Sequence, residues 1–597
     1  MTTTEVEALD VRWDLTHLLD GRGDEAIDAM LDEAARRASE LASRRGQLAG
    51  FDAGDLAAFM TGLAEVSELI GRVGSYAGLA FSTNMADPAR GALVQRVQER
   101  ATAISTELLF FDLEWAALDD DRVAALLADD RLTFARHHLE AARRYRPHLL
   151  SEPEEKILTE KSVTGSSAWV RLFGELTSAL EATLDGATVT LEEALSRLAS
   201  PDRNVRQASA EAVTASLEPG LRTRAFIFNT LLHDKAVNDR LRSYPSWLSS
   251  RNLSNEASDE SVEALVDAVR RRYDIPQRWY RLKARLLGLD RLADFDRMAS
   301  LETEDTQIGW DEARTLVLDS YESFSPQMAT VARRFFDERW IDAPAVPGKR
   351  PGAFCSYTVP SVHPYVLVNY TSRRRDVLTL AHELGHGLHA WMAREQGIFH
   401  QSTPLTLAET ASVFGETVVF GRLLEATDSP QARLALLAEN IEGAIATVFR
   451  QTAMNRFESL VHEARRGEGE LSVERFGDLW QQSQLEMVGD SVEITEGYRS
   501  WWSYIPHFIG TPGYVYAYSY GQLLALSVYR RYEEQGSDFV PRYLNLLSSG
   551  GSMAPETLGN IVGCDLADPG FWDGGLDIVE ANLDAAETAA FDAGYRA

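Results

Sequence analysis

Cysteine and lysine are both scarce in this chain of 597 residues. The two cysteines, Cys355 and Cys564, lie far apart and lack the spacing of metal-binding thiolates. This scarcity argues against a disulfide framework, and a metal site must use other ligands. We expect both cysteines to be small buried residues. Lysine occurs at five positions, so almost all of the positive charge comes from arginine.

Negatively charged residues outnumber positively charged ones. The chain has 59 Lys and Arg residues against 90 Asp and Glu residues, a formal net charge of −31. Nucleic acid is therefore not an expected partner, because phosphate binding requires a positive face. The acidic composition is compatible with a high-salt host or with a biased genome. We favour the second explanation, since an acidic surface mainly serves solubility.

Long apolar runs are also missing. No window approaches 18 uninterrupted apolar residues, and the first fifteen residues, MTTTEVEALDVRWDL, lack the basic and apolar regions of a signal peptide. We expect a cytoplasmic protein that does not bind a membrane. The hydrophobic content of 45% still suffices for a large core, and the length suggests several domains or one lobed catalytic body.

Most of the chain has a helical pattern. From about residue 25 to 180, segments rich in Ala, Leu and Arg repeat apolar residues every three or four positions, which predicts a helical bundle. The Ser-Pro-Asp sequence at residues 200–202 predicts a helix start. We place a boundary there, between an N-terminal helical region (1–200) and a catalytic region (201–597).

A short β-rich segment interrupts the helices. Residues 340–352 contain several prolines and glycines and are predicted to form a loop. Residues 353–358 and 365–371 are β-branched and aromatic, and we predict that they pair as antiparallel strands. The predicted fold is therefore mainly α, with one small sheet beside a helix that begins near Leu378.

That helix contains the sequence LTLAHELGHGLHAW. On a helix, His382 and His386 lie on one face, about 6 Å apart along the axis, so both imidazoles can bind one ion. Glu383 follows the first histidine and is rotated by about 100°, so it can reach a water molecule without binding the metal. This H-E-x-x-H arrangement is typical of zinc peptidases, in which the glutamate transfers protons.

Two glycines lie inside the same helix. Glycine lowers helix stability by roughly 1 kcal/mol relative to alanine in a helix interior. The presence of Gly385 and Gly387 therefore needs an explanation. We predict that they allow another backbone to approach closely, with a second helix that carries a further ligand as the expected neighbour. Compositional drift is the alternative explanation.

A catalytic zinc ion generally has three protein ligands. Residues 405–426 are predicted to form a second helix with Glu409 and Glu416 two turns apart on one face. Glu409 follows His382 by 27 residues, which fits a helix, a loop and a returning helix. We predict Glu409 as the third ligand. Glu416 either orients a ligand histidine or is an ordinary buried polar residue.

These motifs give the chain a resemblance to a known family. The segments LTLAHELGHGLHAW and LAETASVFGE resemble the M3 family of zinc metallopeptidases, the thimet-type oligopeptidases, and within it the oligoendopeptidase F branch. The resemblance covers nearly the whole chain. It implies zinc binding by His382, His386 and Glu409, general acid and base chemistry by Glu383, and a two-lobed helical fold with a deep channel that admits only short peptides.

A further motif, IPHFIGTPGYVYAYSYG, begins at residue 505. Taken alone, its alternating tyrosines fit either a strand face or an aromatic core. The resemblance implies instead that a histidine and tyrosines in this segment bind substrate and stabilise the transition state, and His507, Tyr514 and Tyr518 match best. Gly521 departs from the thimet-type pattern, which has another tyrosine there.

The predicted function is zinc-dependent hydrolysis of internal bonds in short oligopeptides. An exposed strand edge in the pair formed by 353–358 and 365–371 is expected to bind an extended peptide through its backbone. The alternatives are a zinc carboxypeptidase and a non-catalytic peptide-binding protein with the same fold, although binding alone requires no base at Glu383. Short peptides are the expected partners, and the sequence leaves open whether the protein is a monomer or a homo-oligomer.

Overall fold

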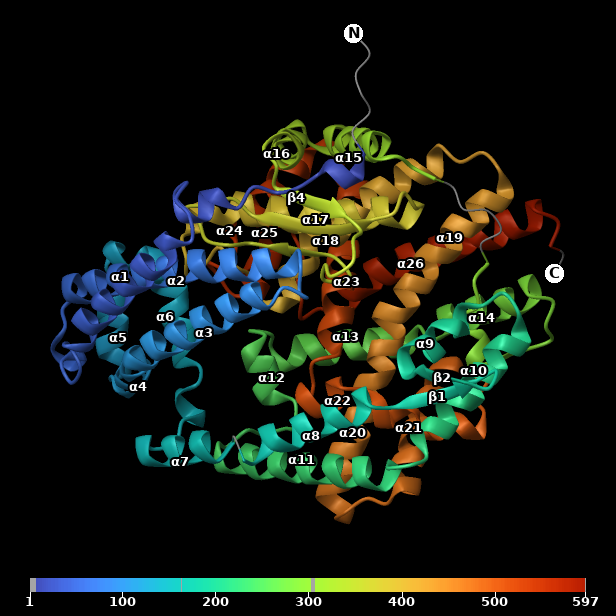
Figure 1. Cartoon of the computed structure of the whole chain (residues 1–597), viewed down its shortest axis with the longest axis horizontal. Coiled ribbons are helices and arrows are strands. Elements are labelled where there is room, and N and C mark those ends of the chain that lie inside the picture. The colour runs from blue at the N-terminus through green and yellow to red at the C-terminus, as the bar shows by residue number, and fades with distance from the viewer. Residues whose placement is uncertain (1–6, 163, 302–306, 596–597) are drawn as a thin grey trace, which may run out of the picture. The chain divides into compact units, whose positions relative to one another are not determined.

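The computed structural model describes residues 7–162, 164–301 and 307–595, and these are mostly helical, with three small sheets (Figure 1). The mainly α prediction is confirmed. Contacts divide the chain into two compact units, each built from three segments. Unit 1 comprises Met1–Arg146, Asp305–Leu423 and Val528–Asp565, and unit 2 comprises Pro147–Glu304, Leu424–Ser527 and Leu566–Ala597. The predicted boundary near residue 200 stays a prediction.

Unit 1 contains the N-terminal helices and the predicted zinc-binding helix. Its helices are α1 (Glu25–Ala42), α2 (Ala53–Ser82), α3 (Pro88–Leu108), α4 (Phe110–Ala117), α5 (Asp120–Leu127), α6 (Arg136–Arg143), α15 (Trp310–Phe324), α16 (Pro326–Asp337), α17 (Arg374–Ala393), most of α18 (Leu405–Glu425), α24 (Val540–Ser549) and α25 (Pro555–Ile561). Helices α1 to α6 share one apolar core, so the predicted bundle is confirmed for these helices, whereas its last part, residues 147–180, belongs to unit 2.

Unit 1 also holds a three-stranded sheet, with the strand order β4-β6-β5. Strands β5 (Phe354–Ser356) and β6 (Tyr365–Tyr370) pair antiparallel, as predicted. Strand β4 (Ile341–Pro344) pairs parallel to β6, so the prediction of a loop throughout 340–352 is wrong. Prolines indicated a loop there, but β4 is an edge strand whose four residues are all buried, and an edge strand tolerates proline.

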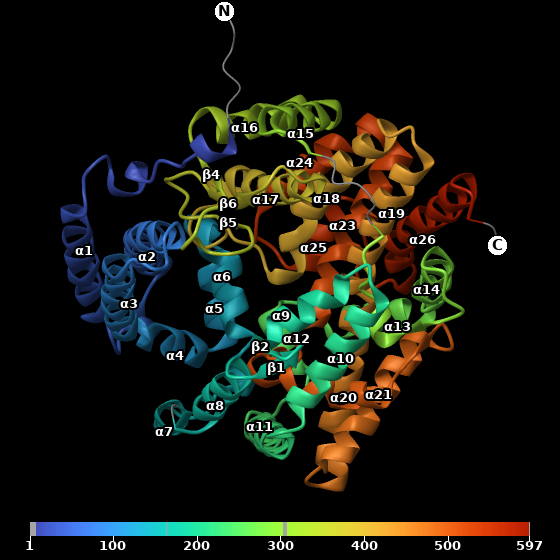
Figure 2. The same ribbon diagram turned by 45° about the vertical axis from the view of Figure 1, so that its right-hand side comes forward.

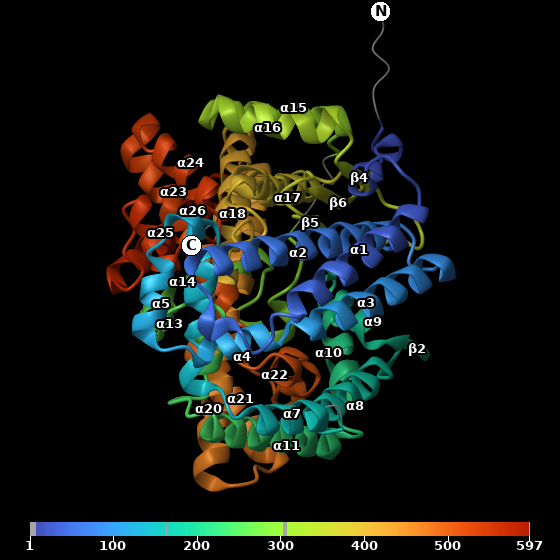
Figure 3. The same ribbon diagram turned by 90° about the vertical axis from the view of Figure 1, so that its left-hand side faces the viewer.

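Helix α17 packs against β5 and β6 of this sheet (Figure 3). Its start is capped by Asp376, whose carboxylate accepts hydrogen bonds from the backbone N–H groups of Thr371 and Arg373. Thirteen of its twenty residues are buried, so the helix is an interior element whose polar side chains must find partners. The small sheet beside the predicted zinc helix is confirmed.

Gly385 is the point where α17 meets α18. A Cβ atom at this position would lie 2.6 Å from Cα of Ser412 and even closer to the carbonyl oxygen of Ala411. The predicted close approach of a second helix is therefore confirmed for Gly385, and the ligand on that helix stays a prediction. Gly387 faces a side chain instead, because its Cβ would lie 2.5 Å from Cζ of Phe335.

Unit 2 is helical with two small two-stranded sheets (Figure 2). Its helices are α7 (Glu152–Ser162), α8 (Ser166–Ser178), α9 (Leu191–Ser196), α10 (Arg203–Leu217), α11 (Leu221–Leu241), α12 (Ser249–Ser254), α13 (Asp259–Arg271), α14 (Asp274–Leu286), α19 (Pro430–Ala444), α20 (Gln451–Glu468), α21 (Val473–Val488), α22 (His507–Gly510) and α26 (Pro569–Asp592), and α23 (Tyr516–Gln535) begins there. Strands β3 (Leu292–Ala293) and β7 (Val492–Glu493) pair in parallel.

A β-hairpin in unit 2 was not expected from the helical pattern. Strands β1 (Glu181–Leu184) and β2 (Ala187–Thr190) are joined by Asp185 and Gly186, which both have positive φ. An Asp-Gly pair favours the two-residue turn that joins such strands, and it is the sequence signal for this hairpin. Helix α10 then begins as predicted, with Asp202 as its N-cap.

No helix among the described residues is long and apolar enough to cross a membrane.

Replacing Gly385 with alanine tests the contact between α17 and α18. The added methyl group would overlap the α18 backbone, so Gly385→Ala is expected to lower the free energy of unfolding by about 1–3 kcal/mol in urea titrations. Gly421→Ala on α18 is the matched control, since no atom lies within 4 Å of its added Cβ. The control should be neutral or slightly stabilising. Equal stability of the two variants would contradict the proposed contact.

Candidate metal centre and active site

Two helices bring three potential metal ligands together in unit 1. One turn of α17 separates His382 from His386, and α18 supplies Glu409. Oε2 of Glu409 lies 3.3 Å from Nε2 of His382 and 3.6 Å from Nε2 of His386. One donor atom from each residue can be chosen so that all three lie within 4.8 Å of one another.

These distances suit a shared ion. Donor atoms about 2.0–2.2 Å from a tetrahedral zinc ion lie roughly 3.3–3.6 Å apart. A direct hydrogen bond would be shorter than the 3.6 Å between His386 and Glu409. Two imidazoles and a carboxylate are also the ligand types of catalytic zinc sites. The residues present therefore fit the predicted zinc ion.

The electrostatics of the cluster also suit a cation. Burial acts to lower the pKa of His382, but its hydrogen bonds with Glu409 and Glu416 outweigh burial and raise that pKa well above its usual value. Burial likewise acts to raise the pKa of Glu409, yet His382 brings it down to about 2. Burial lowers the pKa of His386 to about 4, which keeps its lone pair available. The surroundings thus stabilise positive charge between the ligands.

Two side chains on α18 hold the ligands in place. Oε2 of Glu416 lies 3.1 Å from Nδ1 of His382, on the ring edge opposite the shared donor point. The hydroxyl of Ser412 donates to Oε2 of Glu409 at 2.6 Å. Such partners orient ligand side chains and raise their affinity for metal. The position of Glu416 agrees with the orienting alternative.

Glu383 lies beside this cluster and is only 7% exposed. Burial raises the pKa of Glu383 to about 7, and its carboxylate accepts a hydrogen bond from the backbone N–H of Cys355 on β5. Glu383, His386 and β5 line a cavity of about 390 Å³. A carboxylate in this position can exchange protons with a molecule bound in the cavity.

Tyr357 also lines this cavity, and the sequence analysis did not single it out. Its ring centroid lies 6.5 Å from that of His386. Burial raises the pKa of the Tyr357 hydroxyl well above its usual value, so the hydroxyl keeps its proton and can donate a hydrogen bond. The sequence signal was its place in the β-rich segment before the H-E-x-x-H helix.

The other three predicted site residues lie together in unit 2. Nε2 of His507 is 3.3 Å from the hydroxyl of Tyr518. The ring centroids of Tyr514 and Tyr518 are 5.2 Å apart, and the ring of Tyr514 is nearly parallel to that of His507 at 6.1 Å. One histidine and two tyrosines thus form a compact polar and aromatic group.

The spacing of the tyrosines has a helical explanation. Helix α23 begins at Tyr516, so the strand alternative is wrong. Tyr516 and Tyr520 lie one turn apart and are both fully buried, whereas Tyr514 and Tyr518 are half-buried next to His507. The segment therefore has both a core face and a face that can meet substrate.

A buried carboxyl group holds the backbone between His507 and Tyr514. Oε1 of Glu458, on α20, accepts a hydrogen bond from the backbone N–H of Gly513 at 2.8 Å. Oε2 of Glu458 has no hydrogen-bond partner among the described residues. Burial raises the pKa of Glu458 to about 8, and the hydrogen bond from Gly513 and the charge of Arg251 oppose this shift only in part.

Comparison with known proteins agrees with the resemblance seen in the sequence. Residues 197–577 match the sequence profile of Peptidase family M3, and residues 114–181 match the profile of Oligopeptidase F. Oligopeptidase PepF of Bacillus subtilis is 27% identical over 98% of this chain and 88% of its own length. Group B oligopeptidase PepB of Streptococcus agalactiae is 27% identical over 82% of this chain and 84% of its own.

Solved structures share the fold. A crystal structure from Chlamydophila abortus superposes with a TM-score of 0.88 at 24% identity, covering 98% of this chain and 99% of that one. Oligoendopeptidase-F from Enterococcus faecium gives a TM-score of 0.72 at 22% identity, covering 95% and 99%. The helical architecture is therefore that of known proteins.

Glu458→Gln tests the buried carboxyl group. Because the folded-state pKa of about 8 exceeds the ordinary value of 4.5, the folded state keeps a proton that the unfolded state loses. Stability should therefore fall as pH rises from about 4.5 to about 8, by at most about 1.4 kcal/mol per unit. Glutamine retains the acceptor for Gly513 but cannot ionise. The variant should therefore lack this loss of stability with rising pH.

Urea unfolding at about pH 5 and about pH 8 checks this prediction. The variant should gain stability relative to the wild type at the higher pH. Glu463→Gln, an exposed substitution on the same helix, is the control and should not alter the pH dependence. A constant difference between Glu458→Gln and the wild type at both pH values would contradict the raised pKa.

Proposed function

Because the chain belongs to peptidase family M3, we propose that it is a zinc-dependent endopeptidase that hydrolyses internal bonds of short oligopeptides. One observation supports this function most strongly. His382, His386 and Glu409 direct donor atoms toward one point, and Glu383 lies beside them without contributing a donor to that group. This combination provides both a metal site and a separate proton carrier.

In this proposal, His382, His386 and Glu409 hold the zinc ion. When bound, zinc supplies a Lewis acid that polarises the scissile carbonyl and favours ionisation of water. Glu416 keeps the ring of His382 oriented through its contact with Nδ1, and Ser412 does the same for the carboxylate of Glu409. Both contacts reduce the rearrangement of these two side chains that zinc binding requires.

Glu383 transfers the protons of the reaction. Its carboxylate accepts a proton from the attacking water and then delivers it to the leaving nitrogen. The backbone N–H of Cys355 fixes one side of this carboxylate, so proton transfer does not require a new side-chain orientation. Because Cys355 lies on edge strand β5, the same strand can pair with an extended peptide and align it with Glu383.

His507, Tyr514 and Tyr518 are proposed to contact the substrate and stabilise the transition state. Tyrosine hydroxyls and an imidazole N–H are suitable donors to the developing oxyanion. Their contact with one another in unit 2 supports a shared role. Backbone pairing with β5 would give broad side-chain preference, and the names of the relatives, oligopeptidases, agree with short substrates.

A zinc carboxypeptidase is the alternative enzyme. The two activities differ in whether the substrate needs a free terminal carboxylate, so a peptide acetylated at one end and amidated at the other distinguishes them. The cytoplasmic location and the deep channel stay predictions from the sequence.

Glu383→Gln is expected to lower kcat on the doubly blocked peptide by at least about a hundredfold, because the variant cannot accept a proton. Zinc content should remain equal to that of the wild type, and mass spectrometry should find internal cuts in the wild-type digest. Glu395→Gln, an exposed change just after α17, is the control and should retain activity. Full turnover by Glu383→Gln would disprove the assigned mechanism, and resistance of the blocked peptide would favour the carboxypeptidase.

Glu409→Gln is expected to weaken zinc binding directly, because the variant loses the anionic ligand. Glu416→Gln should have a smaller effect, about 10–100-fold in the dissociation constant, through the orientation of His382. Competition with a chromogenic chelator measures both effects without any substrate. The control is Glu425→Gln at the exposed end of α18, and wild-type affinity in Glu409→Gln would refute the ligand assignment.

A further inference from the structure

Unit 2 contains a cavity of about 530 Å³ that the proposed peptidase chemistry does not use. Its lining residues come from α9, α14, α19 and the segments around residues 295 and 500, and all belong to unit 2. The size lies in the range of small-molecule sites, about 300–1,000 Å³. A π-helical segment, Ile445–Arg450, forms part of the wall, and such segments are frequent at functional sites.

The walls of this cavity are unusually aromatic. They include Tyr280, Tyr498, Trp501 and Tyr504, together with Phe295. Flat aromatic side chains on several sides provide stacking and edge contacts for another ring. The cavity is therefore suited to a planar apolar group.

Two guanidinium groups also line the cavity, and neither forms a salt bridge with a carboxylate among the described residues. Arg297 is 9% exposed and donates to the carbonyl oxygen of Asp294 and to the hydroxyl of Tyr498, and its Nη1, which has no partner, is completely buried. Arg450 is half-buried at the end of the π-helical segment, and no hydrogen bond or ion pair involves its side chain in the described part of the chain. An arginine without an ion pair, such as Arg450, is unexpected in a chain with a net charge of −31.

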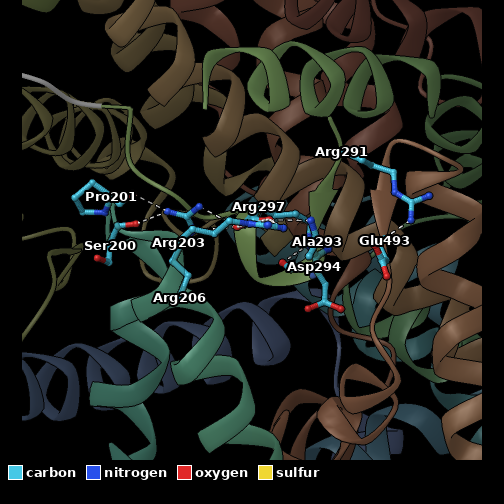
Figure 4. A network of polar contacts seen from close by, with 10 residues as sticks. Ser200, Pro201, Arg203, Arg206, Arg291, Ala293, Asp294, Arg297 and Glu493 are labelled. Carbon is cyan, nitrogen blue, oxygen red and sulfur yellow. Dashed lines mark hydrogen bonds and ion pairs between the residues drawn. The ribbon is translucent and has the colours of Figure 1, made fainter. Parts of the chain in front are cut away.

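The nearby carboxylates are already engaged. Figure 4 shows Arg203 and Arg206, which together bind the carboxylate of Asp296, close to Arg297. Asp294 accepts the backbone N–H of Thr495 at 2.5 Å. Glu442, on α19, pairs with the buried ammonium group of Lys283. The positive charge of Arg450 thus remains available to a ligand.

We propose that this cavity binds a small aromatic molecule with a single carboxylate group, which Arg450 holds while the aromatic walls enclose its ring. A guanidinium matches a carboxylate with two parallel hydrogen bonds. A dianionic phosphate fits less well, because Asp294 and Glu442 contribute negative charge to the same lining. This site is independent of the proposed zinc chemistry.

Para-iodophenylacetate is a suitable probe, because the anomalous signal of iodine locates it in a crystal of the intact protein. We expect the iodine inside the unit 2 cavity and the carboxylate against Arg450. Isothermal titration calorimetry should show that the corresponding amide, which lacks the charge, binds at least about tenfold more weakly. Iodine found only at other places would overturn the proposal.

Arg450→Gln is expected to weaken binding of the probe about tenfold or more, since it removes the charged donor. Arg222→Gln is the control, because Arg222 is exposed on α11 and does not line the cavity. Ala446→Phe fills the cavity from the π-helical wall and should abolish binding. Unchanged affinity in both Arg450→Gln and Ala446→Phe, with thermal stability equal to the wild type, would refute the site.

Discussion

The direct contact between α17 and α18 is the constraint on which the rest of the site depends. At Gly385 the two backbones approach so closely that no Cβ can fit between them. This approach brings Glu409 to the two histidines and Glu416 to the other side of the first ring. Any larger side chain would separate the helices and move a donor atom away from the shared point.

The charge distribution of the cluster follows from that approach. Glu409 and Glu416 are half-buried carboxylates in contact with His382, so a positive charge nearby stabilises them. Their hydrogen bonds raise the pKa of His382 well above its usual value, although burial acts to lower it. Burial lowers the pKa of His386 to about 4. The same helix thus places two histidines in different electrostatic environments, and both suit a shared metal ion.

Local sequence patterns predicted much of the fold and of the site, with instructive exceptions. The three- and four-residue periodicity of 378–391 and 405–426 predicted two helices, and the structure contains them as α17 and α18. Pro344 in β4 and the prolines after it suggested a loop, because the sequence does not reveal that β6 lies beside this segment. The tyrosines at 514–520 alternate like a strand, yet burial of Tyr516 and Tyr520 stabilises a helix. In both cases tertiary packing outweighed the local signal.

The sequence by itself determined that His382 and His386 lie on one helix face with Glu383 beside them, because helical geometry alone fixes these relative positions. Only the tertiary structure decided that Gly385 meets α18 and that Glu416 contacts Nδ1 of His382. Only it revealed that Arg297 and Arg450 line one aromatic cavity. Periodicity specifies neighbours within one helix, whereas contacts between distant segments depend on how whole elements pack.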